Sequence, residues 1–259
     1  MISVSIPLPQ LQMFFLIFMR VGSILMTMPI FKSQSIPLLF RVGLALATSA
    51  VLFPILKLEN FPALTGLTPL AIGIFGEILL GISIGLAVSF IFAGLQLAGQ
   101  LAGYQMGLAI ARVMDPSTNL QIPLLAQFNQ MFALLIFITI NAHHWFIRAL
   151  ADSYRLVPPF GFRISSSLME QLVSMAGNMF VIAIKVGAPV MAALLLTSIA
   201  FGLIARTIPQ MNVFFVAMPL KIAVGLLFVG LCLPYFSSFL KTLFSKLGDT
   251  IMLLLKAVS

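Results

Sequence analysis

Charged residues are scarce in this sequence. Asp, Glu, Lys and Arg make up 8% of its 259 residues, whereas soluble domains usually carry about 25%. So little charge cannot cover the surface of a water-soluble globule, and the 61% of hydrophobic residues is too high for a disordered chain. Cys232 is the only cysteine, which excludes a disulfide scaffold. The composition therefore predicts an integral membrane or membrane-assembly protein.

Acidic residues are the scarcest of the charged types, six against 14 Lys and Arg. The basic residues stand singly in apolar sequence, so nucleic acid is not an expected partner. Cations that flank membrane spans meet anionic headgroups, and membrane lipid is the expected partner of this excess. The first charge, Arg20, lies inside an apolar stretch, so we do not expect the positively charged start of a cleavable signal peptide.

Long apolar stretches dominate the chain instead. A helix that spans a bilayer needs about 20 mostly apolar residues. Six stretches qualify: roughly 11–30, 38–56, 70–96, 124–147, 174–201 and 211–233. Segment 237–259 has apolar residues at helical spacing with charges mostly on other faces, which predicts a C-terminal amphipathic helix. We expect an all-α membrane protein with one domain over 1–259, and the Lys and Arg distribution favours cytoplasmic termini.

Four charges lie inside apolar stretches: Arg20, Glu77, Lys185 and Lys221. A charge in the middle of a bilayer costs about 2.5–3.5 kcal/mol on insertion scales. Three cations cannot be neutralised by one carboxylate, so we expect partner subunits, backbone carbonyls or a wet cavity to supply the missing counter-ligands. A proton relay through Glu77 is the less favoured interpretation. Arg206 leaves two interpretations open, a partner carboxylate or a helix cap.

Two prolines accompany the buried lysines. Pro189 follows Lys185 by four residues, and Pro219 precedes Lys221 by two. Proline inside a helix removes a hydrogen bond and frees a carbonyl, so both positions predict helix breaks. Such breaks shape helices for a curved assembly or build the ligand site of a secondary transporter. A small-solute permease with a site made from Glu77, Lys185 and Lys221 is therefore an alternative function.

The segment 94–116 is rich in glycine. Small residues recur every four positions at Gly99, Gly103, Gly107 and Ala111, a stripe that lets helix backbones approach closely. Asp115 and Pro116 end the segment, because the residue before a proline is pushed out of the helical conformation. The segment fits plain tight packing or a pore constriction.

Residues for catalysis or metal binding are missing. His143 and His144 adjoin Trp145 with no acidic residue at metal-ligand spacing, which favours anchoring at the membrane interface. No acid–base pair or activated nucleophile is visible. We therefore expect no enzymatic activity, no cofactor and no bound metal.

Five blocks of sequence occur in an order typical of one family. They are RVGSILMTMPIF (20–31), GEILLGISIG (76–85), AGYQMGLAIARVMDP (102–116), NAHHWFIRALADSYRLVP (141–158) and APVMAALLLTSIAFGLIARTIPQMNVFFVAMPLK (188–221). Along nearly its whole length the sequence resembles the FliR family of flagellar biosynthetic proteins and their injectisome counterparts.

The resemblance implies a subunit of the type III export gate, in the bacterial inner membrane and the flagellar basal body. Its fold would consist of bent hydrophobic helical hairpins. It would assemble with FliP-like and FliQ-like subunits and with FlhB and FlhA-like export components, and pass unfolded secreted proteins. The resemblance also implies a plug in the closed channel formed by Gly103, Tyr104, Gln105, Met106 and Gly107, continuing through Asp115.

Overall fold

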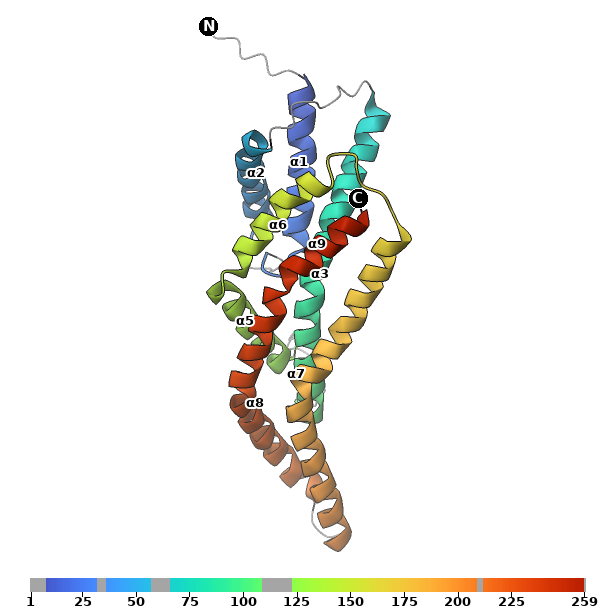
Figure 1. The fold of residues 1–259 in the computed structure, drawn as a ribbon. Helices are drawn as coiled ribbons and strands as arrows, with labels where there is room; N and C mark the ends of the chain where they lie inside the picture. Colours follow the sequence, from blue (N-terminus) through green and yellow to red (C-terminus); the bar gives the residue numbers. More distant parts are fainter. Residues whose placement is uncertain (1–7, 32–35, 57–65, 109–122, 209–211, 259) are drawn as a thin grey trace. The chain divides into compact units, whose positions relative to one another are not determined.

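The computed structural model describes residues 8–31, 36–56, 66–108, 123–208 and 212–258, and their regular structure is all α-helical (Figure 1). The all-α prediction is confirmed. The helices are α1 (Leu8–Thr27), α2 (Leu38–Ile55), α3 (Leu67–Gln105), α5 (Leu124–Thr139), α6 (Ala142–Leu156), α7 (Ser166–Thr207), α8 (Val213–Ser245) and α9 (Leu247–Val258).

Three of the helices are long compared with a bilayer. At a rise of about 1.5 Å per residue, the 39 residues of α3, the 42 residues of α7 and the 33 residues of α8 extend over about 58, 63 and 50 Å. The hydrocarbon layer of a bilayer is about 30 Å thick. By length and composition, five described helices are suited to cross a membrane, or up to six when α5 and α6 count as one broken span. The apolar composition and these helices together make the chain an integral membrane protein.

The helix bounds extend beyond several of the predicted apolar stretches into the segments between them. The stretch 97–123 begins as helix, because α3 continues to Gln105. The stretch 148–172 contains the second half of α6, and 203–212 begins inside α7. The predicted amphipathic helix 237–259 is divided between the end of α8 and α9. Apolar content locates the spans, but helices continue through polar residues wherever backbone hydrogen bonding is not interrupted.

Neither α7 nor α8 ends at its predicted break, and a kink at Pro189 or Pro219 stays a prediction. Pro189 lies inside α7 and Pro219 inside α8, and both helices continue through them. A proline removes one backbone hydrogen bond, and the remaining bonds of a long apolar helix stay in place because no water competes for them.

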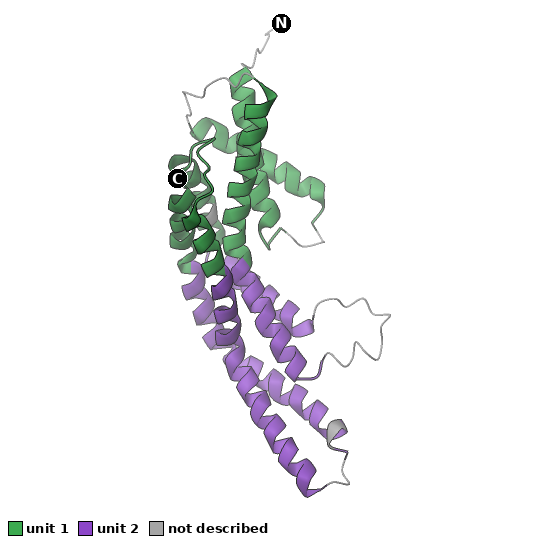
Figure 2. Cartoon of the chain, turned by 90° about the vertical axis from the view of Figure 1, so that its right-hand side faces the viewer, with its two compact units in different colours: residues 1–89, 141–175, 245–259 green, residues 90–140, 176–244 purple. Residues whose placement is uncertain are grey.

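The chain divides into two compact units, each assembled from segments that are distant in sequence (Figure 2). Unit 1 comprises residues 1–89, 141–175 and 245–259, and unit 2 comprises residues 90–140 and 176–244. Helices α3, α7 and α8 contribute residues to both units. A single domain over 1–259 stays a prediction.

Each unit has its own core. In unit 1, α1 packs on α2 and α6 packs on α9. The Ser165 hydroxyl accepts a hydrogen bond from the Leu168 N–H at 3.1 Å and donates one to the Ala257 carbonyl at 2.6 Å, so it caps α7 and joins it to α9. In unit 2, the rings of Phe92, Phe137 and Phe244 meet with centroids 5.1–6.1 Å apart.

Candidate functional site

The glycine-rich segment ends helix α3 with a defined turn. Gly107 has a φ of 84°, in the left-handed region that glycine adopts without strain. The Leu108 N–H donates to the Gly103 carbonyl at 3.1 Å, and the Gly107 N–H donates to the Tyr104 carbonyl at 3.0 Å. These two bonds form a Schellman motif, in which a left-handed residue closes the last turn of a helix. Gly107 therefore stops the helix rather than extending the predicted stripe.

Met106 is anchored at this turn. Its side chain is fully buried, at 0% exposure, among Ala102, Leu125, Val190 and Leu194 of α3, α5 and α7. On α8, Gly225 makes room for it: a Cβ atom at residue 225 would lie 2.1 Å from the Met106 methyl carbon. Helices α3, α5, α7 and α8 thus converge on one thioether side chain.

The predicted small-residue stripe is a close packing surface at one of its described positions. A Cβ atom at Gly99 would lie 2.6 Å from the Ala126 Cα, so α3 and α5 touch backbone to backbone there. Gly103 is looser, because the nearest atom to its added Cβ would be 3.9 Å away. Tyr104 and Gln105 are exposed. Ala111, Asp115 and Pro116 lie outside the described residues.

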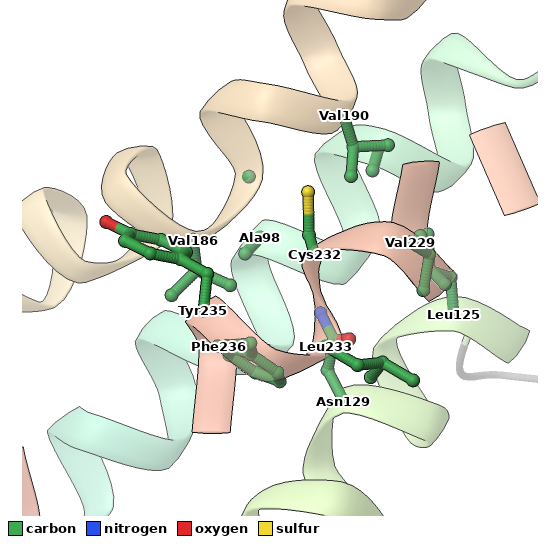
Figure 3. Close-up of a pocket in the computed structure, with 12 residues that line it drawn as sticks. Ala98, Leu125, Asn129, Val186, Val190, Val229, Cys232, Leu233, Tyr235 and Phe236 are labelled. Carbon is green, nitrogen blue, oxygen red and sulfur yellow. The ribbon is translucent and has the colours of Figure 1, made fainter. Parts of the chain in front are cut away.

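A small cavity adjoins the Met106 cluster (Figure 3). It is lined mainly by apolar side chains, with three residues that carry polar groups, Asn129 of α5 and Cys232 and Tyr235 of α8. The Asn129 side-chain amide donates to the Leu95 carbonyl at 3.3 Å, which fixes its position. The cavity shares Leu125 and Val190 with the packing around Met106, so empty space lies beside the side chains that hold this methionine.

Unit 1 contains a very different cluster, centred on Arg20 of α1. The guanidinium group forms a bidentate ion pair with Glu77 of α3, through Nε and through Nη2, the latter at 2.9 Å. It also donates to the Ser153 hydroxyl at 3.2 Å and to the Val157 carbonyl at 3.0 Å. The Tyr154 ring lies 4.0 Å from its central carbon, a cation–π contact. Arg20 and Glu77 are 0% and 2% exposed.

Small residues bring α1 and α3 close enough for this ion pair. A Cβ atom at Gly81 would lie 1.8 Å from the Ser23 hydroxyl oxygen, and one at Gly85 would lie 1.7 Å from that of Thr27. Glu77 is one helical turn before Gly81, on the same face of α3. The close approach of the two helices therefore places the carboxylate beside the guanidinium group.

The structure assigns internal counter-ligands to one of the three cations in apolar stretches. Arg20 and Glu77 neutralise each other, because packing brings together two residues 57 positions apart in sequence. Lys185 and Arg206 are exposed and Lys221 is half-buried. Their contacts with other subunits stay predictions.

The five sequence blocks gather in two places. Residues from 20–31, 76–85 and 141–158 meet at the Arg20 cluster in unit 1. Residues from 102–116 and 188–221 meet around Met106 in unit 2. Sequence reasoning missed the Arg20–Glu77 pair and the role of Gly225. The spacing of Glu77, Gly81 and Gly85, which puts them on one face of α3, was the signal that could have revealed the first.

Comparison with known proteins identifies the family. The model of the family described as bacterial export proteins, family 1, matches residues 11–247. The chain belongs to this family. It is 33% identical over 251 residues to the flagellar biosynthetic protein FliR of Bacillus subtilis (strain 168), covering 95% of both chains. The FliR proteins of Escherichia coli (strain K12) and Aquifex aeolicus (strain VF5) are 32% and 30% identical, over 92% and 84% of this chain and 90% and 83% of theirs.

Family membership and the apolar helices together define the coarse role of the chain: it is a membrane-embedded component of the flagellar export apparatus. The Arg20 and Met106 clusters are two buried sites in the part of this FliR-family chain that the structure describes. The first is a candidate structural lock, and the second holds the start of the candidate gating segment.

Proposed function

We propose that this chain is a non-catalytic subunit of the entry channel for unfolded flagellar proteins in the bacterial inner membrane, at the flagellar basal body. It assembles there with FliP-like and FliQ-like subunits and works with FlhB and FlhA-like components. Its glycine-rich segment, residues 99–116, gates the channel. The observation that carries the gating role is the burial of Met106 at the turn where α3 stops.

The anchoring of Met106 suits a segment that must be held and then released. The contacts around it are apolar, and no charged group has to be stripped of a partner when they separate. Methionine is unbranched and flexible, so it packs against surfaces of changing shape. The adjoining cavity supplies free space into which the neighbouring side chains can move. Displacement of the segment by a passing chain is therefore inexpensive.

The closed channel must exclude ions while it waits for cargo. Apolar side chains held against glycine leave little room for water, which an ion needs along its path. Within this proposal, α3 supplies the rigid support up to Gln105, and the chain turns out of the helix at Gly107.

The test is leakage through the assembled complex. We expect Met106→Asp, co-expressed with the FliP-like and FliQ-like subunits in cells, to raise the leakage of small molecules, because a buried carboxylate without a partner displaces the segment. Met131→Asp is the matched control, since Met131 of α5 is 65% exposed. Unchanged leakage in a fully assembled Met106→Asp complex would refute the gating role.

A second test addresses assembly. We expect the tagged chain to be recovered in a stable form only when the FliP-like and FliQ-like subunits are co-expressed, and to retain them through purification. The permease alternative predicts a stable isolated chain that moves a solute across vesicles. No observation favours that alternative, since Glu77 is bound by Arg20 and Lys185 is exposed.

A further inference from the structure

One lysine of α7 has an unusual setting. Lys185 is exposed, and no hydrogen bond or ion pair joins its ammonium group to any other residue that the structure describes. On its own side of α7, the exposed neighbours Val181, Ala188 and Ala192 are apolar, whereas Asn178, two turns before Lys185, is exposed and polar. An ammonium group set in such a face is costly in hydrocarbon unless an opposite charge meets it.

In the same turn of α7, one backbone carbonyl group lacks its usual hydrogen-bond donor. Pro189 lies inside α7 and has no N–H group. The carbonyl of Lys185, four residues earlier, therefore lacks its usual helical donor. One turn of α7 thus presents both a cation and a carbonyl oxygen without its helical donor, on an exposed apolar helix.

Lipid alone cannot cover the apolar face of α7. Exposed apolar side chains follow one another along this helix from Val173 to Ile204. At about 1.5 Å per residue they extend over about 46 Å, whereas the hydrocarbon layer is about 30 Å thick. Part of this face must therefore be covered by protein.

The described carboxylates of this chain are poorly placed to form an ion pair with Lys185. Among the described residues, Glu77 is the acidic residue inside a long apolar stretch, and Arg20 occupies it. Asp152 lies 3.6 Å from Arg155, and Asp249 lies in the first turn of α9. Glu170 is exposed on α7 itself, but it lies 15 residues before Lys185, about 22 Å along the helix, so two α7 helices packed side by side in the same direction would not bring the two groups together.

We infer that the face of α7 around Lys185 binds an apolar helix of a different membrane-embedded subunit, which presents an aspartate or glutamate to the Lys185 ammonium group. This inference rests on the proposed function, because it needs an assembly of several subunits. It adds the chemistry of one contact: a single carboxylate within an otherwise apolar helix.

Carbodiimide cross-linking of the assembled complex tests the contact directly. A hydrophobic carbodiimide joins an amine to a carboxylate that touches it, and mass spectrometry of the digested complex identifies the joined residues. We expect an amide between Lys185 and an Asp or Glu of another subunit. A Lys185 that stays free, or that is joined to a carboxylate of this chain or of a second copy, overturns the inference.

Substitutions supply the second measurement. We expect Lys185→Met to lower the amount of partner retained in detergent about tenfold, which corresponds to about 1.4 kcal/mol of binding free energy. Lys185→Arg keeps the charge and should retain more partner than Lys185→Met. Lys246→Met is the matched control, because Lys246 is an exposed lysine in the short junction between α8 and α9.

The outcomes separate this inference from the proposed function. If the wild-type chain retains no other subunit, the proposed function fails and the inference fails with it. If the wild-type complex forms and Lys185→Met retains as much partner as Lys246→Met, the inference alone fails.

Discussion

The two buried clusters of this chain hold their helices together by opposite means. Around Arg20, a bidentate ion pair and further hydrogen bonds fix the directions in which the groups must point. Around Met106, a flexible thioether side chain rests against the backbone at Gly225, and no direction is preferred. The difference teaches that the Arg20 cluster resists rearrangement, whereas the Met106 cluster tolerates it.

The largest expected effect comes from removing the charge of Glu77. Glu77→Gln leaves the Arg20 guanidinium group buried without an opposite charge, and we expect it to destabilise the fold by about 3–5 kcal/mol. The measurement is the thermal unfolding midpoint of the purified complex. Asp152→Asn is the control, because its partner Arg155 is 82% exposed and such a surface pair contributes about 0–1 kcal/mol. Equal losses in the two variants would contradict a locking role for Arg20.

Close packing near the ion pair gives the next effect. Gly81→Ala places a methyl group 2.8 Å from the Arg20 carbonyl oxygen and closer still to the Ser23 hydroxyl. We expect a loss of about 1–3 kcal/mol from overpacking, read from the same unfolding midpoint. Gly22→Ala is the matched control in α1, since its added Cβ meets nothing within 4 Å. That control should be neutral or stabilising by up to about 1 kcal/mol.

A substitution at Gly225 tests whether the Met106 cluster tolerates rearrangement. Gly225→Ala forces the end of the Met106 side chain to move. Because that end is flexible, we expect a loss of about 1 kcal/mol, at the low end of overpacking costs, together with increased leakage through the assembled complex. Gly230→Ala, also in α8, meets nothing within 4 Å and should not change leakage.

A double-mutant cycle sharpens this result. Met106→Ala removes the side chain that Gly225→Ala would strike, so the combined variant should lose less stability than the two single losses together. Strict additivity would show that the two positions do not interact.

The smallest effect is expected at Gly107. Gly107→Ala puts a side chain at a φ of 84°, which costs about 1 kcal/mol because L-residues are strained in the left-handed region. We expect little change in the unfolding midpoint and a modest rise in leakage. A stability loss as large as that of Glu77→Gln would contradict the view that this turn ends α3 but contributes little to the stability of the fold.

The sequence predicted the fold class well and the contacts poorly. Apolar runs of about 20 residues indicate helices reliably. They do not show which helices pack against each other. Arg20 and Glu77 were recognised as costly charges, yet their pairing depends on the packing of α1 on α3 through Gly81. Three cations and one carboxylate in apolar sequence left partner subunits, backbone carbonyls and a wet cavity as possible counter-ligands, and composition alone did not show which cation pairs with Glu77.

The glycine-rich segment shows the same limit on a smaller scale. A repeat of small residues every four positions predicted one continuous stripe through Gly99, Gly103 and Gly107. Gly99 does touch a neighbouring backbone, but Gly107 adopts a left-handed conformation and ends the helix. The sequence does not distinguish these two roles of glycine. Only the backbone conformation shows whether a glycine makes a packing contact or ends a helix.

The contact of Met106 with Gly225 also constrains how this family can vary over time. A larger residue at position 225 costs less where position 106 carries a shorter side chain, because the two compete for the same space. Substitutions at these sites should therefore appear as matched pairs among related genes, although 119 residues separate them along the polypeptide.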